Sequence, residues 1–278
     1  MFAIRWEKGG KSGYMPSYEF DKYSLQRHKI GGGTFQNFEH KRYKPLTDSE
    51  FEKHLLGQQL IGLYPLLTDN TSWFIAADFD KENWAEECKA FINICTENDL
   101  SAYLERSRSG NGGHVWIFFD KPYPAQKSRK ILTDLLEQSG AFSVFEKDSS
   151  FDRLFPNQDY LSGKGLGNLI ALPLHKPAVE KGNSCFIDPE TLQPFDDQWE
   201  FFNEIQRTST ETLDKVFLTV NKDDFFGSNN NKSVTVSGKL IIRLSNKIFL
   251  NRSGIALPLI NFLKEELSVS NGYCPINC

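Results

Sequence analysis

The sequence lacks the features of secreted and membrane-spanning proteins. It has five cysteines, an odd number without a framework of spacings, which argues against a disulfide-stapled fold and favours a reducing compartment. No run of about 18 apolar residues occurs, so no transmembrane helix is expected. The first seven residues also lack the charged-then-apolar layout of a signal peptide. We therefore expect a cytoplasmic protein.

A large excess of positive charge is also missing. The chain has 32 lysines and arginines against 36 acids, and its net charge is −4. This balance excludes a protein that coats nucleic acid by bulk electrostatic attraction, although it is compatible with one local basic groove. Residues 1–44 hold such a local excess, with nine lysines and arginines against four acids. Aromatic residues are interleaved with these charges: Tyr14, Tyr18, Phe20, Tyr23, Phe35, Phe38 and Tyr43. The segment suits single-stranded nucleic acid, and it equally suits a solvated, loosely structured N-terminal region.

At 278 residues the chain is long enough for one large domain with an appendage. Hydrophobic periodicity and capping residues predict helices over residues 46–59, 84–98, 125–138 and 195–205. Short apolar runs predict strands over residues 73–77, 102–104, 115–119 and 168–174. The order strand, helix, strand, strand, helix, strand predicts an α/β (α+β) fold with a mixed sheet, not a doubly wound parallel one. We expect a main domain over 1–220, a polar linker over 221–233 and a C-terminal appendage over 234–278, with a hairpin over 235–249 and a helix over 257–267.

The first candidate site is the sequence Asp78-Phe79-Asp80, which ends the apolar run Trp73–Ala77. Alternation along a strand puts Asp78 and Asp80 on one face, about 7 Å apart along the backbone. Two like charges at a strand end are costly unless a cation lies between them. The pair therefore predicts a site for divalent metals that clamp the oxygens of an in-line displacement. Some glycosyltransferases use the same triplet for a metal-bound nucleotide sugar.

The second candidate site is the turn between Arg106 and His114, which leads directly into a strand. Its three glycines within residues 110–113 predict a nest of backbone N–H groups around an anion. Arg106 and Arg108 supply forked donors for phosphate, and His114 stands at the start of the strand. A P-loop is excluded, because that motif needs Gly-Lys-Ser/Thr at the opening of a helix. We expect phosphate binding here, with a purely structural His114 as the alternative.

A third acid, Asp159, precedes a glycine-containing turn and the strand that starts at Asn168. It could complete a set of three metal ligands, or it could be an ordinary turn residue.

Together the three elements resemble the archaeo-eukaryotic primase superfamily. Its hallmarks are an acidic pair, a histidine that follows small residues at a strand start, and a third acid before a strand. The likeness to the primase domain of TOTE conflict systems and to CRISPR-associated primase-polymerases covers about residues 46–205. It is carried by these stretches: His54-Leu55-Leu56-Gly57, Tyr64-Pro65-Leu66-Leu67, Glu105 to Phe119, Phe151 to Asp159, Gly167 to Leu174, Gly182-Asn183-Ser184 and Gln198-Trp199.

The resemblance implies an RRM-like catalytic core packed with an N-terminal α/β module. It also implies a DNA primase-polymerase that makes and extends primers, in which a 3′-hydroxyl attacks an α-phosphate and pyrophosphate leaves. The metal ligands would be Asp78, Asp80 and Asp159, which would hold two Mg²⁺ or Mn²⁺ ions. Asp159 is favoured because Asp159-Tyr160-Leu161 and the strand after it resemble a stretch in polymerase domains of bacterial repair ligases. Asp152 is the second choice.

The resemblance also implies the substrates and partners. Single-stranded DNA would be the template, nucleoside triphosphates the substrates, and a fused or associated helicase the partner. The residues expected at the incoming nucleotide are Arg106, Arg108, Ser109, Asn111, Gly112, His114, Lys164 and Asn168. Many relatives have a lysine where this chain has Asn111, so the charge of the triphosphate would fall to Arg106, Arg108 or Lys164. The alternatives are a non-catalytic module that binds single-stranded nucleic acid and a metal-dependent glycosyltransferase.

Overall fold

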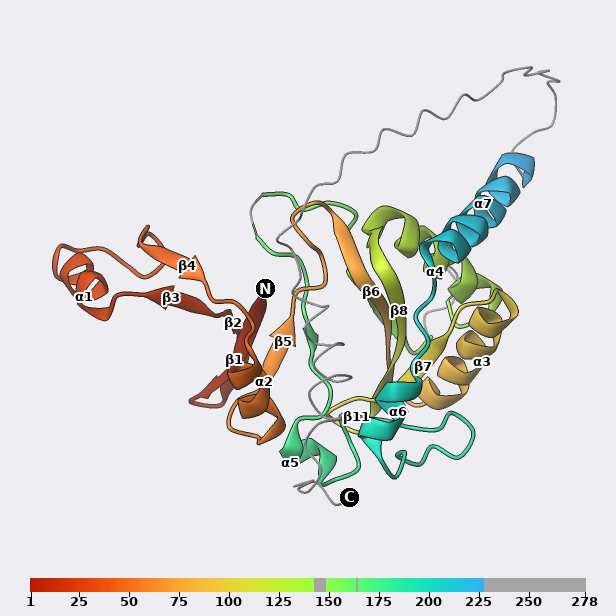
Figure 1. The fold of residues 1–278 in the computed structure, drawn as a ribbon, viewed down its shortest axis with the longest axis horizontal. Coiled ribbons are helices and arrows are strands. Elements are labelled where there is room, and N and C mark those ends of the chain that lie inside the picture. The colour runs from red at the N-terminus through yellow and green to blue at the C-terminus, as the bar shows by residue number, and fades with distance from the viewer. Residues whose placement is uncertain (143–148, 164, 228–278) are drawn as a thin grey trace.

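The computed structural model describes residues 1–142, 149–163 and 165–227, with side chains as far as residue 221 (Figure 1). Lys164 and the C-terminal appendage over 234–278, with its expected hairpin and helix, lie outside the described residues. Among the residues described, no helix is both long and apolar enough to cross a membrane.

A five-stranded sheet forms the centre of the molecule. Its order is β11-β7-β8-β6-β9, and the strands are β6 (Thr71–Asp80), β7 (Ala102–Arg106), β8 (Gly112–Pro124), β9 (Phe151–Phe155) and β11 (Cys185–Phe186). The strand pairs in this sheet are antiparallel. The parallel contact that the described residues show is an isolated bridge between Phe119 and Thr208, so the sheet is essentially antiparallel where we expected a mixed one. The α/β class itself is confirmed.

Two helices cover one face of this sheet. They are α3 (Trp84–Glu97), which follows β6, and α4 (Ala125–Gln138), which follows β8. Helix α3 buries Cys88, Phe91 and Cys95 at helical spacing, and the rings of Phe91 and Phe79 lie 6.0 Å apart. The succession β6-α3-β7-β8-α4-β9, with β8 and β6 at the centre, is the β-α-β-β-α-β arrangement of ferredoxin-like and RRM-like domains. Asp78 and Asp80 alternate with Phe79, so they point to the face opposite α3 and α4.

A second sheet lies beside the first. It has the order β10-β5-β1-β2 and consists of β1 (Phe2–Lys8), β2 (Lys11–Pro16), β5 (Ile61–Leu63) and β10 (Ile170–Ala171). Phe2, Ile61 and Leu63 from this sheet belong to the same buried core as the residues of β6 and β8. Helix α2 (Asp48–Leu55) packs against this sheet through the fully buried His54, whose Nδ1 accepts a hydrogen bond from the Ile61 N–H at 3.2 Å.

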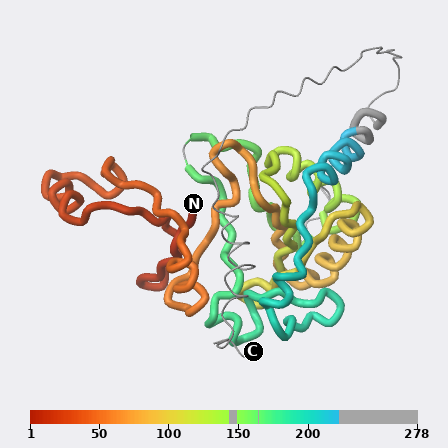
Figure 2. Tube along the Cα trace, in the orientation of Figure 1, coloured from red at the N-terminus to blue at the C-terminus, as the bar shows by residue number. Residues whose placement is uncertain are grey.

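The segment between β2 and α2 forms an arm that projects from the body (Figures 1 and 2). We call residues 17–44 the N-terminal arm. It contains β3 (Tyr18–Phe20), α1 (Lys22–Ile30) and β4 (Lys41–Tyr43), and β3 pairs with β4 in a two-stranded sheet. At its base, the Lys44 N–H donates to the Ser17 carbonyl at 2.9 Å. The alternative of a loosely structured N-terminal region is therefore wrong.

The C-terminal part of the described chain is helical. After α5 (Lys176–Val179), helix α6 (Gln198–Glu204) is capped at its N-terminus by Asp197, whose carboxylate accepts hydrogen bonds from the Trp199 and Glu200 N–H groups. Helix α7 (Thr210–Gly227) packs on α4, where the Tyr123 hydroxyl and the Lys127 ammonium both reach Asp214. Since α7 ends at Gly227, the first residues of the expected linker at 221–233 are helical.

Candidate active site

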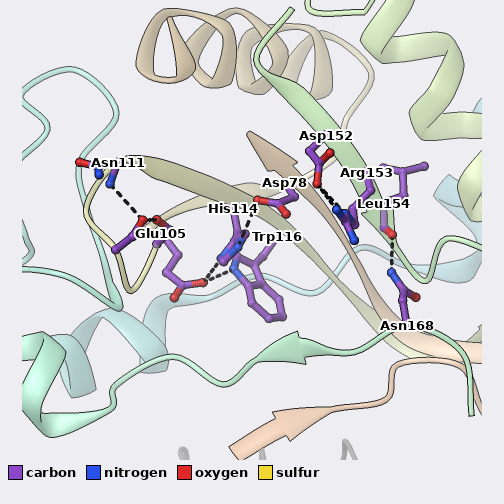
Figure 3. Close-up of polar contacts among 11 residues, drawn as sticks. Asp78, Glu105, Asn111, His114, Trp116, Asp152, Arg153, Leu154 and Asn168 are labelled. Carbon is purple, nitrogen blue, oxygen red and sulfur yellow. Dashed lines mark hydrogen bonds and ion pairs between the residues drawn. The ribbon is translucent and has the colours of Figure 1, made fainter. Parts of the chain in front are cut away.

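Three carboxylates meet on the face of the five-stranded sheet opposite α3 and α4. One oxygen each from Asp78, Asp80 and Asp152 lies within 4.8 Å of the others. Asp78 and Asp80 come from the end of β6, as the alternation of the strand predicts. Asp152 comes from the neighbouring strand β9. In Figure 3, Asp152 lies above Asp78 on the adjacent strand.

A β-bulge brings Asp152 to this face. In the ladder between β6 and β9, Asp78 pairs with Arg153 but Phe79 pairs with Phe151, so Asp152 is an extra residue. In a regular strand, Asp152 and Arg153 would point to opposite faces, whereas a bulge can re-aim a side chain. The bulge therefore allows the Asp152 carboxylate to approach Asp78 and Asp80.

Asp159, which we expected as the third metal ligand, lies elsewhere. Its carboxylate forms an ion pair with the guanidinium of Arg129 on α4. In the part of the chain that the structure describes, Asp78, Asp80 and Asp152 are the acids close enough to share a metal ion, and Asp159 is not one of them. The second choice of the sequence analysis, Asp152, replaces it in the cluster. Asp152 also forms an ion pair with its neighbour Arg153, at 2.5 Å.

The cluster concentrates negative charge. Burial and the neighbouring carboxylates of Asp78 and Asp152 raise the pKa of Asp80 above its ordinary value. Arg153 provides a nearby positive charge: its hydrogen bond to Asp152 and the charges of Asp78 and Asp80 raise its pKa. A group of carboxylates that repel one another beside a single guanidinium has the chemistry of a divalent-cation site.

His114 lies in the centre of the sheet, between two carboxylates. It is opposite Asp78 on one side and opposite Glu105 on the other, so the three side chains share one face. Nδ1 of His114 lies 2.9 Å from Oε2 of Glu105, and Nε2 lies 3.4 Å from Oδ1 of Asp78. Figure 3 shows the imidazole in this position, with its Nε2 edge toward the acid cluster.

The two carboxylates keep the imidazole charged. Burial alone would lower the pKa of His114, but Glu105 and Asp78 outweigh it and raise the pKa to about 10. Glu105 is itself buried and accepts a second hydrogen bond, from Nε1 of Trp116 at 2.8 Å. Glu105 was not among the site residues that we expected from the sequence. The available signal was a glutamate inside a short buried strand, which needs a partner.

The turn from Ser107 to Asn111 is a tight connection between β7 and β8. The Ser107 N–H donates to the Gly112 carbonyl at 2.9 Å, and the Gly110 N–H donates to the Ser107 carbonyl at 3.0 Å. The Asn111 N–H donates to Oγ of Ser109 at 3.2 Å. The Gly110 and Asn111 amides, which lie in the segment that we expected to surround an anion, are thus engaged within the turn. Gly112 and Gly113 belong to β8.

The two glycines of β8 are required by close packing. A Cβ at Gly112 would lie 2.4 Å from the Phe79 carbonyl oxygen and 2.5 Å from Oδ1 of Asp80. A Cβ at Gly113 would lie 2.8 Å from the ring of Trp84 on α3. Gly112 therefore leaves the space that the Asp80 carboxylate occupies, and Gly113 lets α3 pack closely on the sheet.

Two residues expected at the nucleotide, Arg106 and Asn168, bond to other parts of the chain. The guanidinium of Arg106 donates to the carbonyl oxygens of Gly182 and Leu192, which ties β7 to the loop after α5. The Asn168 side chain donates to the Leu154 carbonyl at 2.9 Å and accepts from the Asn157 N–H at 3.0 Å (Figure 3). Asn168 thus holds the end of β9 against the segment that leads to β10. Arg108, by contrast, is exposed at the tip of the turn.

The fold and the site together define a ferredoxin-like α/β domain with clustered carboxylates on its sheet. The family described as the TOTE conflict system, Archaeo-Eukaryotic Primase domain, matches residues 1–216. The chain belongs to this family, and the resemblance found in the sequence is confirmed. Its membership of a primase family implies nucleic acid and nucleotides as substrates. Among curated proteins, none matches the chain.

Proposed function

We propose that the chain is a template-directed nucleotidyltransferase, a DNA primase-polymerase that makes and extends primers on single-stranded DNA. The observation that carries this proposal is the cluster of Asp78, Asp80 and Asp152 within 4.8 Å, beside a buried, charged His114, in a chain of the primase family.

The donor set fits a pair of divalent cations. Carboxylate oxygens are the ligands that Mg²⁺ and Mn²⁺ prefer. The pKa of Asp80 is raised by burial and by repulsion from Asp78 and Asp152, and a cation would relieve this repulsion. Asp78, Asp80 and Asp152 would hold the ions. When bound, Mg²⁺ or Mn²⁺ neutralises the charge that develops on the phosphate oxygens during the displacement.

The other side chains of the site would position the nucleotide. A protonated His114 places a fixed positive charge at the edge of the acid cluster, where a phosphate oxygen of the nucleotide would be bound. Glu105 holds the ring in place through Nδ1. The exposed Arg108 is our candidate for the outer phosphates, since Arg106 is bonded to carbonyl oxygens. Positioning and electrostatics of this kind supply most of the catalysis in phosphoryl transfer.

The direct test is incorporation of labelled nucleotide on primed and on unprimed single-stranded DNA, with Mg²⁺ or Mn²⁺. Ribonucleotides and deoxynucleotides are supplied in turn. We expect wild-type protein to incorporate nucleotide, and Asp78→Asn/Asp80→Asn to lose this activity while it keeps its fold by circular dichroism. Binding of single-stranded DNA without incorporation of nucleotide would indicate a non-catalytic module. Turnover of a nucleotide sugar would indicate a glycosyltransferase.

The role of His114 is tested separately. His114→Ala should weaken binding of the nucleotide more than binding of the template, because it removes the positive charge at the edge of the acid cluster. If Nε2 turns from Asp78 to a phosphate oxygen when the nucleotide binds, the charge-assisted hydrogen bond that is lost contributes roughly 1.5–3 kcal/mol. Titrations with labelled nucleotide and with labelled single-stranded DNA compare the two losses. Equal losses would mean that His114 has a structural role only.

A further inference from the structure

The N-terminal arm has charged and aromatic side chains that the proposed reaction does not use. Residues 17–44 have six lysines and arginines and three acids, in a chain whose net charge is −4. The arm projects from the body (Figures 1 and 2). Positive charge is therefore presented away from the acid cluster, where an anionic chain can reach it.

Helix α1 of the arm has no buried residue. Its exposed positions are Lys22, Tyr23, Gln26, Arg27, Lys29 and Ile30. A surface helix is normally stabilised by burying one apolar face, and a nine-residue helix is marginal without such packing. The first turn contains no acid, and the last turn contains Arg27, His28 and Lys29. The helix thus presents cations and an aromatic ring to solvent.

The arm is nevertheless held in one conformation by its own contacts. Phe38 is buried between the rings of His28 and His40. The Lys41 ammonium donates to the carbonyl oxygens of Phe35, Gln36 and Phe38 at 2.7–3.0 Å. The exposed rings of the arm are therefore fixed on a folded support, which reduces the entropy lost when a ligand binds them.

Aromatic rings and cations alternate on this support. The Tyr43 and Tyr18 rings are stacked with centroids 5.0 Å apart, and Tyr43 remains 44% exposed. They line an open hollow of about 420 Å³ together with Phe38, Glu39, Lys41 and Arg42. On α1, Tyr23 is 67% exposed, and the Arg27 guanidinium lies 5.0 Å from its ring centroid. Exposed rings beside cations are the composition of surfaces that bind single strands by stacking bases and pairing phosphates.

We propose that the N-terminal arm is a second binding surface for single-stranded DNA, separate from the acid cluster. Bases stack on Tyr23 and Tyr43, and phosphates contact Lys22, Arg27, Lys29 and Arg42. A duplex does not fit this chemistry, because its bases are already stacked on one another. That the bound strand is the template rests on the proposed function, whereas the binding itself does not.

The test is fluorescence anisotropy of a labelled oligothymidylate about 16 nucleotides long, titrated with the full 278-residue chain without nucleotide or metal. Tyr23→Ala should weaken binding about tenfold, and Tyr23→Phe should leave it unchanged because the phenyl ring still stacks. Lys22→Gln/Lys29→Gln should reduce the slope of log affinity against log salt by about 1.4, since each phosphate contact on a single strand contributes roughly 0.7.

Matched controls lie on the body of the protein. Tyr160 is 57% exposed, and Lys121 and Lys181 are exposed cations. Tyr160→Ala and Lys121→Gln/Lys181→Gln should leave the affinity and the salt slope as in the wild type. Equal effects in the arm and control variants would overturn the proposal. Conversion of a dimer to a monomer by Tyr23→Ala, without a change in DNA affinity, would also overturn it and assign the arm to a second copy of the chain.

Activity distinguishes this proposal from the proposed function. Where nucleotide incorporation is observed, Tyr23→Ala should raise the KM for the template about tenfold and leave kcat unchanged. If wild-type protein incorporates no nucleotide but the arm variants still lose oligothymidylate binding, the proposed function fails and the arm surface stands. If incorporation is normal and Tyr23→Ala binds as the wild type does, the arm surface fails alone.

Discussion

At the residue scale, Asp152 and Asp159 give the sharpest test of the site, because both are carboxylates near β9 and only one lies in the cluster. We expect Asp152→Asn to lower activity by orders of magnitude and to require more metal, since it removes one of three ligand charges. Asp159→Asn should retain activity and lose at most about 1 kcal/mol of stability, because it breaks a partly exposed ion pair with Arg129.

Metal-dependence curves for the two variants, measured side by side, decide the assignment. The substitution is the same in both, so each variant is the control for the other. An inactive Asp159→Asn together with an active Asp152→Asn would restore the ligand set that the sequence alone favoured.

Of the two carboxylates that raise the pKa of His114, Glu105 has the larger effect, so we expect Glu105→Gln to lower this pKa from about 10 toward its ordinary value of 6.5. The glutamine also turns one donor toward either His114 or Trp116, which costs about 1–3 kcal/mol for the buried group left unpaired. Because the pKa of His114 in the folded protein is raised, its stabilisation is complete below pH 6.5 and is lost as the pH rises through about 10. Glu105→Gln should lack most of this pH dependence.

Titration of the His114 ring by nuclear magnetic resonance in the metal-free protein measures the shift. Trp116→Phe is the control, because it removes the other donor to Glu105 and leaves the contact between Glu105 and His114 intact. A pKa that stays near 10 in Glu105→Gln would show that Asp78 alone keeps the ring protonated.

At the scale of elements, the sequence predicts best where a strand or helix has a strong pattern of its own. The apolar run before Asp78 predicted the core of β6, and the stripe of Ile131, Leu132, Leu135 and Leu136 predicted α4 with the bounds that the structure has. Strand β9 has no such pattern, and no strand was predicted there from the sequence. Its partner and its bulge arise from pairing with β6, so no local signal shows that Asp152 reaches the cluster.

Strands β6 and β8 approach each other closely at Gly112, and this close approach leads to a second prediction. In Gly112→Ala, the new Cβ would overlap the Phe79 carbonyl oxygen and the Asp80 carboxylate. We expect Asp80 to be displaced, so that metal affinity and activity fall at least tenfold. Gly165→Ala is the matched control, because a Cβ there meets nothing within 4 Å. Titration of Mn²⁺ binding by electron paramagnetic resonance compares the two, and equal affinities would contradict the packing role of Gly112.

At the scale of the whole molecule, strand pairing joins segments that are far apart in the sequence. The four-stranded sheet combines residues 2–16, 61–63 and 170–171, and its strands β5 and β10 have only three and two residues. The sequence predicted a strand over 168–174, which contains β10, but strands as short as β5 and β10 lack a period of their own. It therefore predicted neither the sheet nor its place beside β6. The resemblance supplied the class of fold. The contacts of Arg106 and Asn168 join segments that are far apart in the sequence, so no local pattern predicts them.

The balance of charge in the cluster predicts how metal affects the stability of the whole protein. The pKa of Asp80 is raised by burial and by Asp78 and Asp152, so its ionised form destabilises the metal-free fold at neutral pH. Asp80→Asn should therefore raise the melting temperature of the metal-free protein.

A bound cation should stabilise the wild type. A cation that binds only the folded state, present at 100 times its Kd, raises the free energy of unfolding by about 2.7 kcal/mol, which corresponds to roughly 5–10 °C in melting temperature for a domain of this size. Thermal melts with and without Mn²⁺ should show this rise in the wild type and little of it in Asp80→Asn, whereas Asp159→Asn should respond as the wild type does. An equal rise in wild type and Asp80→Asn would place the metal away from Asp80 and contradict the assignment of the cluster.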